Sequence, residues 1–213
     1  RVYRQKLTDQ LVPDTELELM LTDTQPPRQH DTKPLAFDDE GNMYTIFGAP
    51  SDACQVDDRS PMSPGMYPCP LLEKRGGIWR FDANKKNQFQ EDGEKFATGL
   101  RSVVGLDWNA QNDKLYAVVH GRDYLHSTWP REFTVWEGAV LPSEVFLGLE
   151  KGDDAGWPYH YYDQIKDAVR QLQIEVGATP DGSFGTATLE SILKRQGLIR
   201  DFPRGLSYGR IAA

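Results

Sequence analysis

The sequence predicts a mainly β fold over residues 1–163, a small all-α domain over 164–200 and a tail over 201–213. Short strand-like segments with turn residues between them recur up to about residue 160, with no helical pattern among them. One strand–turn–strand pattern occurs twice. After Tyr162 the spacing of apolar residues changes to that of an amphipathic helix.

The repeated pattern lies at residues 35–48 and 106–121, which align apart from two extra residues in the second copy, one of them in its turn. Each copy has a short strand, a turn of Asp, Asn and Gly, and a second strand with a Tyr and β-branched residues. Segments 77–84 and 144–149 are predicted as further strands. Such repeats indicate β-propeller blades, although the spacing of about 71 residues exceeds the usual 40–50. A β-sandwich is the alternative.

Two helices are predicted in the C-terminal region. The first has apolar residues at helical spacing and ends at Gly177, and a turn at 179–182 follows it. The second opens at 186–188 and is closed by Gly197. The apolar positions of the first helix are Ile165, Val169, Leu172 and Val176.

Composition limits the function classes. The chain has 213 residues, enough for one or two domains, and a hydrophobic content of 38% that can build real cores. Its formal net charge of −8 argues against nucleic-acid binding, which needs a basic surface. No run of eighteen apolar residues predicts a membrane span. Because the chain begins with Arg1 rather than Met, we expect a processed or truncated start.

Cys54 and Cys69 are the only cysteines, and they flank a proline-rich segment. They are either a disulfide or two free thiols. A disulfide closing this loop would stabilise the fold by roughly 3 kcal/mol through the unfolded state. It would also favour an oxidising compartment, the periplasm or the exterior.

Seven motifs in one fixed order resemble the glucose/sorbosone dehydrogenase family. They are His-Asp-Thr-Lys at 30–33, Gly-Ala-Pro-Ser-Asp-Ala-Cys-Gln at 48–55, Pro-Cys-Pro at 68–70, Gly-Ile-Trp-Arg-Phe-Asp-Ala at 77–83, Thr-Gly-Leu-Arg-Ser at 98–102, His-Gly-Arg-Asp at 120–123 and Gly-Trp-Pro at 156–158. The resemblance covers residues 1–163. It implies a six-bladed β-propeller that uses pyrroloquinoline quinone (PQQ) and Ca²⁺.

The resemblance assigns His30 as the catalytic base that takes the proton of a sugar hydroxyl while hydride passes to the quinone. An imidazole suits this task because it titrates near neutrality. The simpler alternative is a turn histidine bonded to the backbone. The same resemblance places Arg101 against the cofactor, whose carboxylates a guanidinium fork can bind. Ser102 stands where the family usually has Asn, and Lys33 is a further candidate for the cofactor or substrate pocket.

Gly121 and Arg122 match the turn whose main-chain carbonyls hold Ca²⁺ in the family. Ca²⁺ prefers oxygen ligands and would polarise the quinone carbonyl. Asp123, Asp153 and Asp154 are acids nearby, for which solvated loop positions are the simpler interpretation.

Length is the main departure from the family. Six blades need about 350 residues, so residues 1–163 would form a partial six-bladed-type β-propeller of three to four blades. Unpaired strand edges favour aggregation or pairing with another chain. We therefore expect a fragment, a half completed by a partner chain, or a degenerate copy.

Residues 164–199 resemble a small peptidoglycan-binding domain, chiefly through Asp-Gly-Ser-Phe-Gly at 181–185. The resemblance implies that the glycines permit positive φ and that Phe184 plugs the helices. A generic helical hairpin is the alternative. No His follows His160, so metal-dependent amidase chemistry has no His ligands here.

Two functions follow as hypotheses. The first is a periplasmic or secreted quinoprotein that oxidises an aldose or related sugar by hydride transfer to PQQ. The second is a non-catalytic partial propeller that binds a partner and is tethered to the cell wall by its helical domain. A hydrolase has little support, because neither a Gly-x-Ser-x-Gly nor a His-Glu-x-x-His motif occurs.

Overall fold

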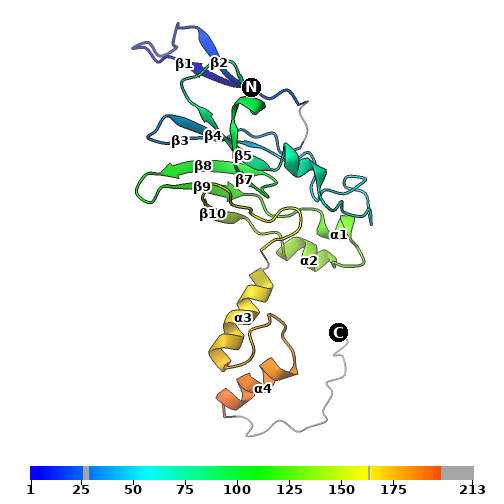
Figure 1. Ribbon diagram of the computed structural model, residues 1–213. Helices are drawn as coiled ribbons and strands as arrows, with labels where there is room; N and C mark the ends of the chain where they lie inside the picture. Colours follow the sequence, from blue (N-terminus) through cyan, green and yellow to red (C-terminus); the bar gives the residue numbers. More distant parts are fainter. Residues whose placement is uncertain (26–28, 163, 198–213) are drawn as a thin grey trace. The chain divides into compact units, whose positions relative to one another are not determined.

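The computed structural model describes residues 1–25, 29–162 and 164–197 (Figure 1). The chain forms two compact units, Arg1–Tyr162 and Asp163–Ala213, and each is described by itself. The first unit is mainly β. The second has two helices among its described residues. No helix in the described ranges is long and apolar enough to cross a membrane.

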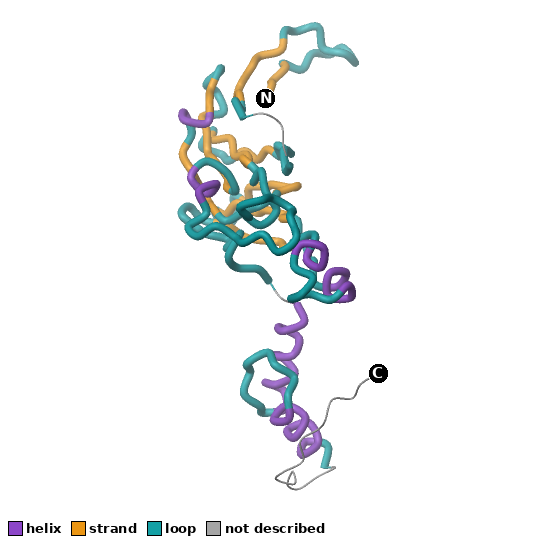
Figure 2. Tube along the Cα trace, turned by 90° about the vertical axis from the view of Figure 1, so that its right-hand side faces the viewer, coloured by secondary structure: helices purple, strands orange, loops and turns teal. Residues whose placement is uncertain are grey.

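The first unit contains three sheets that follow one another in Figures 1 and 2. The N-terminal sheet has the order β1-β2-β6, from β1 (Val2–Gln5), β2 (Leu17–Thr22) and β6 (Gln88–Phe89). The central sheet has the order β3-β4-β5-β7, from β3 (Leu35–Phe37), β4 (Asn42–Phe47), β5 (Gly77–Asp82) and β7 (Glu94–Thr98). The third sheet has the order β10-β9-β8, from β8 (Val103–Asn109), β9 (Lys114–Val119) and β10 (Val145–Leu149).

Both predicted hairpins are present, as the antiparallel pairs β3–β4 and β8–β9. The turn of the first is held by Asp38, whose Oδ1 accepts from the backbone N–H of Glu40 and Asn42 at 3.0 and 2.8 Å. Gly41 takes φ +85°, a conformation that favours glycine. The predicted strands near residues 77–84 and 144–149 are β5 and β10. Four strands, β1, β2, β6 and β7, had no clear pattern in the sequence.

The central sheet is covered on both faces. One face packs on the N-terminal sheet through Met43 and Phe47. The other packs on the third sheet through Tyr44 and Ile46, and the Tyr44 ring stacks on that of Trp108 at 5.3 Å between centroids. Alternate residues of β4 thus face different neighbours, as the twofold periodicity of a strand requires.

The third sheet repeats this pattern with one face open. The repeat aligns Tyr44 with Tyr116 and Ile46 with Val118. Ile46 is fully buried, whereas Val118 is 37% exposed and the neighbouring Phe146 is 69% exposed. The outer face of the third sheet therefore carries apolar side chains where the central sheet is covered. This three-sheet arrangement has the alternation expected of successive propeller blades.

Two short helices follow β9, α1 (Leu125–Thr128) and α2 (Val135–Val140). The 3₁₀ turns Pro70–Glu73 and Gln90–Asp92 lie earlier in the chain, before β5 and before β7. The expectation that no helix lies before residue 160 is wrong here. Thr134 and Glu137 form a reciprocal cap, in which Thr134 Oγ1 accepts from the Glu137 N–H and Glu137 Oε2 accepts from the Thr134 N–H. This Thr-x-x-Glu spacing was the signal available in the sequence.

Cys54 and Cys69 form a disulfide, and the free-thiol alternative is excluded. Both are buried, at 0% and 5% exposed, in the loop between β4 and β5. This loop carries several residues of the site described below. The disulfide thus ties its two ends together near that site.

The second unit contains α3 (Gln164–Val176) and α4 (Thr186–Arg195). The expectation that Phe184 plugs the helices is wrong, because its side chain is 57% exposed. The buried group is Gln173, 1% exposed, whose amide donates to Asp181, Ser183 and Thr188 and accepts from the Gly182 N–H. A polar side chain therefore orders the interhelical loop. Peptidoglycan binding by this unit stays a prediction.

Candidate functional site

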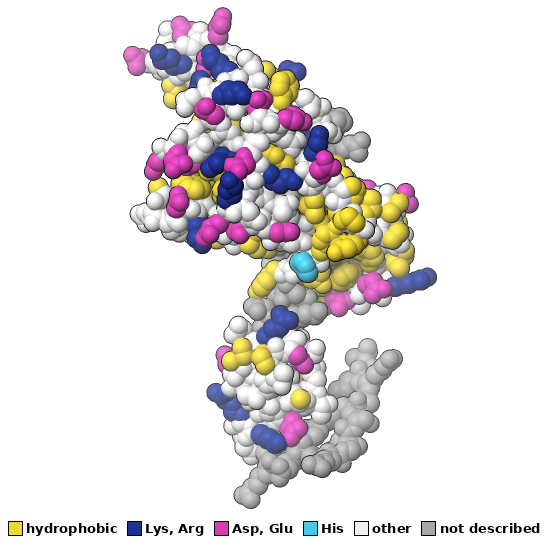
Figure 3. All heavy atoms as spheres, viewed as in Figure 1, with side chains coloured by type: hydrophobic (Ala, Val, Ile, Leu, Met, Phe, Trp, Pro, Cys, Tyr) yellow, Lys and Arg dark blue, Asp and Glu magenta, His cyan; other side chains and the backbone are white. Residues whose placement is uncertain are grey.

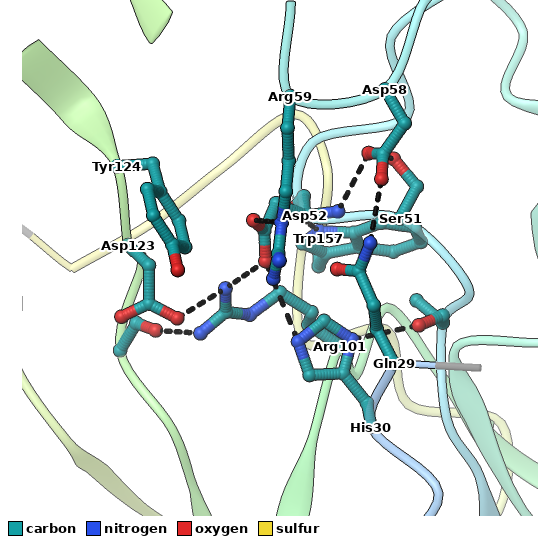
Figure 4. Close-up of polar contacts among 12 residues, drawn as sticks. Gln29, His30, Ser51, Asp52, Asp58, Arg59, Arg101, Asp123, Tyr124 and Trp157 are labelled. Carbon is teal, nitrogen blue, oxygen red and sulfur yellow. Dashed lines mark hydrogen bonds and ion pairs between the residues drawn. The ribbon is translucent and has the colours of Figure 1, made fainter. Parts of the chain in front are cut away.

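Asp52 joins two of the predicted site residues, His30 and Arg101, into one network (Figure 4). It lies in the loop after β4, with a side chain 7% exposed. Its Oδ1 accepts from Arg101 Nη1 at 2.8 Å and lies 3.4 Å from His30 Nε2. Its Oδ2 accepts from Arg59 Nε at 2.7 Å. One carboxylate therefore serves three cationic or titratable side chains.

His30 is held by the end of β4. Its backbone takes φ +59°, and its carbonyl lies so close to Gly48 that a Cβ at that position would clash with it. His30 Nδ1 lies 2.7 Å from the Ala49 carbonyl oxygen. Because a carbonyl can only accept, Nδ1 carries a proton, which leaves Nε2 as the nitrogen that faces Asp52. The ring is 11% exposed.

Arg101 follows β7 at a turn where Gly99 takes φ +72°. Besides Asp52, its Nη1 donates to Asp123 Oδ2 at 3.0 Å, and its Nη2 donates to the Gly121 carbonyl. The side chain is 4% exposed. Three hydrogen bonds thus hold the guanidinium inside the protein. The contact between Arg101 and a quinone stays a prediction.

The charges around Asp52 keep it ionised. Burial raises its pKa, but hydrogen bonds from His30 and Arg59 and the charges of Arg101 and Arg59 outweigh burial and lower the pKa to about 2. Asp52 is therefore a carboxylate at every physiological pH. It can orient the imidazole and stabilise it when it becomes charged.

Trp157 brings a distant segment of the chain to the same place. Its indole Nε1 donates to the backbone carbonyl of Asp52 at 2.7 Å, across 105 residues of sequence. The motifs at 30–33, 48–55, 98–102, 120–123 and 156–158 therefore meet in one region. Figure 4 shows one side chain from each of them: His30, Asp52, Arg101, Asp123 and Trp157. Their order along the sequence did not reveal that Asp52 is the residue that connects them.

Lys33 and Ser102 lie apart from this network. Lys33 pairs with Asp23 at 3.2 Å, next to Arg75, which donates to both oxygens of Asp23 at 2.7 and 2.9 Å. Lys33 and Arg75 also lie over the Phe47 ring, at 5.1 and 5.5 Å. Ser102 is buried, and its backbone carbonyl accepts from the His120 N–H. Both residues have structural partners, and their cofactor role stays a prediction.

The predicted calcium position at Gly121 and Arg122 does not fit the residues as they are arranged. The Gly121 carbonyl oxygen already accepts a hydrogen bond from Arg101, which is positively charged and also donates to Asp123. A cation bound there would face another cation at contact distance. In the described part of the chain, no group of three His, Cys, Asp or Glu side chains could hold a metal ion.

The carboxylates of a quinone cofactor fit a different residue. Arg122, next to Gly121, has its Nε and Nη2 atoms buried without a hydrogen-bond partner. An unmatched guanidinium suits a carboxylate-bearing group. Neither the unmatched donors nor their surroundings could be derived from the sequence motif.

The first unit is a mainly β protein whose three sheets pack face to face, as in a partial propeller. The Asp52 network lies in the loops that connect their strands. No protein-family model matches the chain, and no curated protein matches it. Solved structures show weak similarity, at TM-scores below 0.5 and identities of 15–20%.

The calcium structure of a Trichoderma reesei protein of Carbohydrate-Active Enzymes Family AA12 is 15% identical, with a TM-score of 0.47, over 67% of this chain and 34% of that one. The PQQ-bound aldose sugar dehydrogenase of Streptomyces coelicolor is 20% identical, with a TM-score of 0.35, over 70% and 35%. The PQQ domain of Coprinopsis cinerea pyranose dehydrogenase is 15% identical, with a TM-score of 0.39, over 51% and 25%. The chain thus spans about a third or less of the length of each.

Proposed function

We propose that the first unit belongs to a PQQ-dependent sugar dehydrogenase, in which His30 accepts the proton of a sugar hydroxyl and Asp52 orients it. The observation that carries this proposal is the shared contact of His30 and Arg101 with Asp52. Residues from separate motifs of the family resemblance meet at one buried carboxylate. A disulfide fits an oxidising compartment, so we infer secretion or a periplasmic location.

The step that this chain's own residues would carry out is a proton transfer. When bound, the quinone would accept hydride from the sugar carbon. With Nδ1–H held by the Ala49 carbonyl, Nε2 is the nitrogen that would take the proton of the sugar hydroxyl, and to do so it must be unprotonated rather than donating to Asp52. The Asp52 carboxylate, 3.4 Å away, stabilises the imidazolium that results. Arg59 and Arg101 hold Asp52 in place and keep it ionised.

The test uses the purified chain with PQQ, an aldose and an artificial electron acceptor, with and without Ca²⁺. His30→Gln is expected to lower the rate more than about a hundredfold, the usual contribution of a general base. Asp52→Asn should lower it too. His126→Gln is the matched control, because His126 bonds the Phe133 carbonyl outside the network. Full turnover by His30→Gln would end the proposal.

A non-catalytic binding module is the second candidate. The observation that favours it is the guanidinium of Arg101, which donates to Asp52, Asp123 and the Gly121 carbonyl and whose side chain is 4% exposed. In that case PQQ or sugar would bind without turnover, and His30→Gln would leave binding unchanged. Measuring binding and dye reduction on the same samples separates the two functions.

A further inference from the structure

Arg122 is a partly buried cation, and two of its nitrogen donors have no hydrogen-bond partner among the described residues. It follows Gly121 in the loop after β9, and its Nε and Nη2 atoms are buried without a hydrogen-bond partner in the described structure. A buried donor left unmatched costs free energy, and an unmatched charge costs more. Such a group therefore destabilises the fold unless a ligand supplies the missing hydrogen-bond acceptors.

The acidic side chains of the neighbouring network do not accept hydrogen bonds from the Nε and Nη2 atoms of Arg122. Asp52 accepts from Arg101 and Arg59, and Asp123 accepts from Arg101. Each of these hydrogen bonds goes to a guanidinium other than that of Arg122. These two carboxylates therefore leave the Nε and Nη2 donors of Arg122 without an acceptor.

Aromatic rings hold the Arg122 guanidinium in place. Its Cζ lies 3.0 Å from the centroid of the Tyr161 ring and 5.6 Å from that of Phe133. Contacts with ring faces favour a cation, but they leave the N–H groups in the guanidinium plane without acceptors. The two rings thus leave the Nε and Nη2 donors without an acceptor, which a planar group such as a carboxylate would supply.

Arg122 also borders two hollows large enough for a ring-sized ligand. One is about 390 Å³ and includes Trp129, Phe133, Trp157 and Tyr161 in its lining. The other is about 320 Å³ and is lined in part by Arg101, Trp157 and Tyr161. Hydrophobic side chains gather on the face around α1 and α2 (Figure 3). A site that joins apolar walls to one charged group is typical of a small-molecule pocket.

We propose that Arg122 anchors a carboxylate-binding subsite, in which its guanidinium binds the carboxylate of a ligand whose ring packs against Trp157 and Tyr161. Two sources supply this chemistry, a carboxylate of PQQ or that of an acidic sugar such as a uronic acid. The subsite goes beyond the proposed function, because it would serve a binding module as well as a dehydrogenase.

The test is calorimetric titration of the full chain with PQQ, glucuronate and glucose. At least one of the two carboxylate probes should bind, and Arg122→Gln should weaken it more than about tenfold, as expected for a lost charge-assisted hydrogen bond. Weakening of PQQ alone assigns the subsite to the cofactor, and weakening of glucuronate assigns it to an acidic sugar. Arg131→Gln is the matched control, because Arg131 is exposed and the charge change is the same.

Three results would overturn the subsite. They are no binding of either carboxylate probe, equal weakening by Arg122→Gln and Arg131→Gln, and equal weakening of glucose and the carboxylates. If Arg122→Gln does not fold, Arg122→Lys keeps the charge and should weaken the carboxylate probe less than tenfold. In the unmodified chain, added salt should weaken the carboxylate probe and leave glucose unchanged. Equal salt effects on both would also contradict the proposal.

Discussion

Asp52 and Arg101 form an ion pair of 2.8 Å across 49 residues of sequence, and their side chains are only 7% and 4% exposed. The same guanidinium binds the Gly121 carbonyl and Asp123. The pair thus connects the loop after β4, the turn after β7 and the loop after β9. It is the structural centre of the candidate site.

Removing Arg101 is expected to destabilise the first unit strongly. Arg101→Met leaves the Asp52 carboxylate buried with fewer partners, and loss of one member of a buried pair costs about 3–5 kcal/mol. Urea unfolding followed by tryptophan fluorescence measures the change. Arg80→Met is the control, because Arg80 pairs with the more exposed Glu94 and should cost about 1 kcal/mol or less. Equal effects of the two variants would contradict a buried pair.

Stability is expected to fall in acid through Asp52. Its pKa is lowered from 3.8 to about 2 in the folded chain, so folding favours the ionised form. The stabilisation is therefore fully present above about pH 4 and is lost as the pH falls from 4 toward 2. A shift of this size corresponds to about 2 kcal/mol. Asp52→Asn should show a flatter dependence between pH 5 and 2, and an unchanged slope would be evidence against the lowered pKa.

Two adjacent residues of β9 should differ strongly in how much stability the chain loses when each is replaced by Lys. Ala117 is fully buried against the central sheet, whereas Val118 lies on the outer face and is 37% exposed. Ala117→Lys should prevent stable folding, because it places a charge in the core. Val118→Lys should change stability by less than about 1 kcal/mol in this chain. Thermal melts of both variants test which face of the sheet each side chain lies on. A severe loss of stability in Val118→Lys would show that the outer face is covered.

Loss of the disulfide should destabilise the loop that carries Asp52. Cys54 and Cys69 are 15 residues apart, and a loop of this length contributes about 3 kcal/mol. Cys54→Ser combined with Cys69→Ser should lower the free energy of unfolding by that order. Reduction of the unmodified protein should have the same effect, and if it does not, the substitutions act through packing at buried Cys54 instead.

The local elements could be predicted from the sequence. The hairpins at 35–48 and 106–121, the strands β5 and β10 and the bounds of α4 depend on neighbouring turn residues and on periodicity. The Thr134–Glu137 cap is one more local signal, because its Thr-x-x-Glu spacing marks the start of a helix. The short strands β1, β6 and β7 could not be predicted, because their pairing depends on distant partners.

The sequence by itself determined the repeated β hairpins, the helical hairpin and the set of motifs that marked a site. Only the tertiary structure decided that Asp52 joins His30 to Arg101, that Arg101 occupies the Gly121 carbonyl, and that Arg122 keeps unmatched donors. Local hydrogen bonds and turns depend on residues a few positions apart. The partners of a buried charge are set by how the loops of successive sheets meet, and sequence spacing carries no record of that geometry.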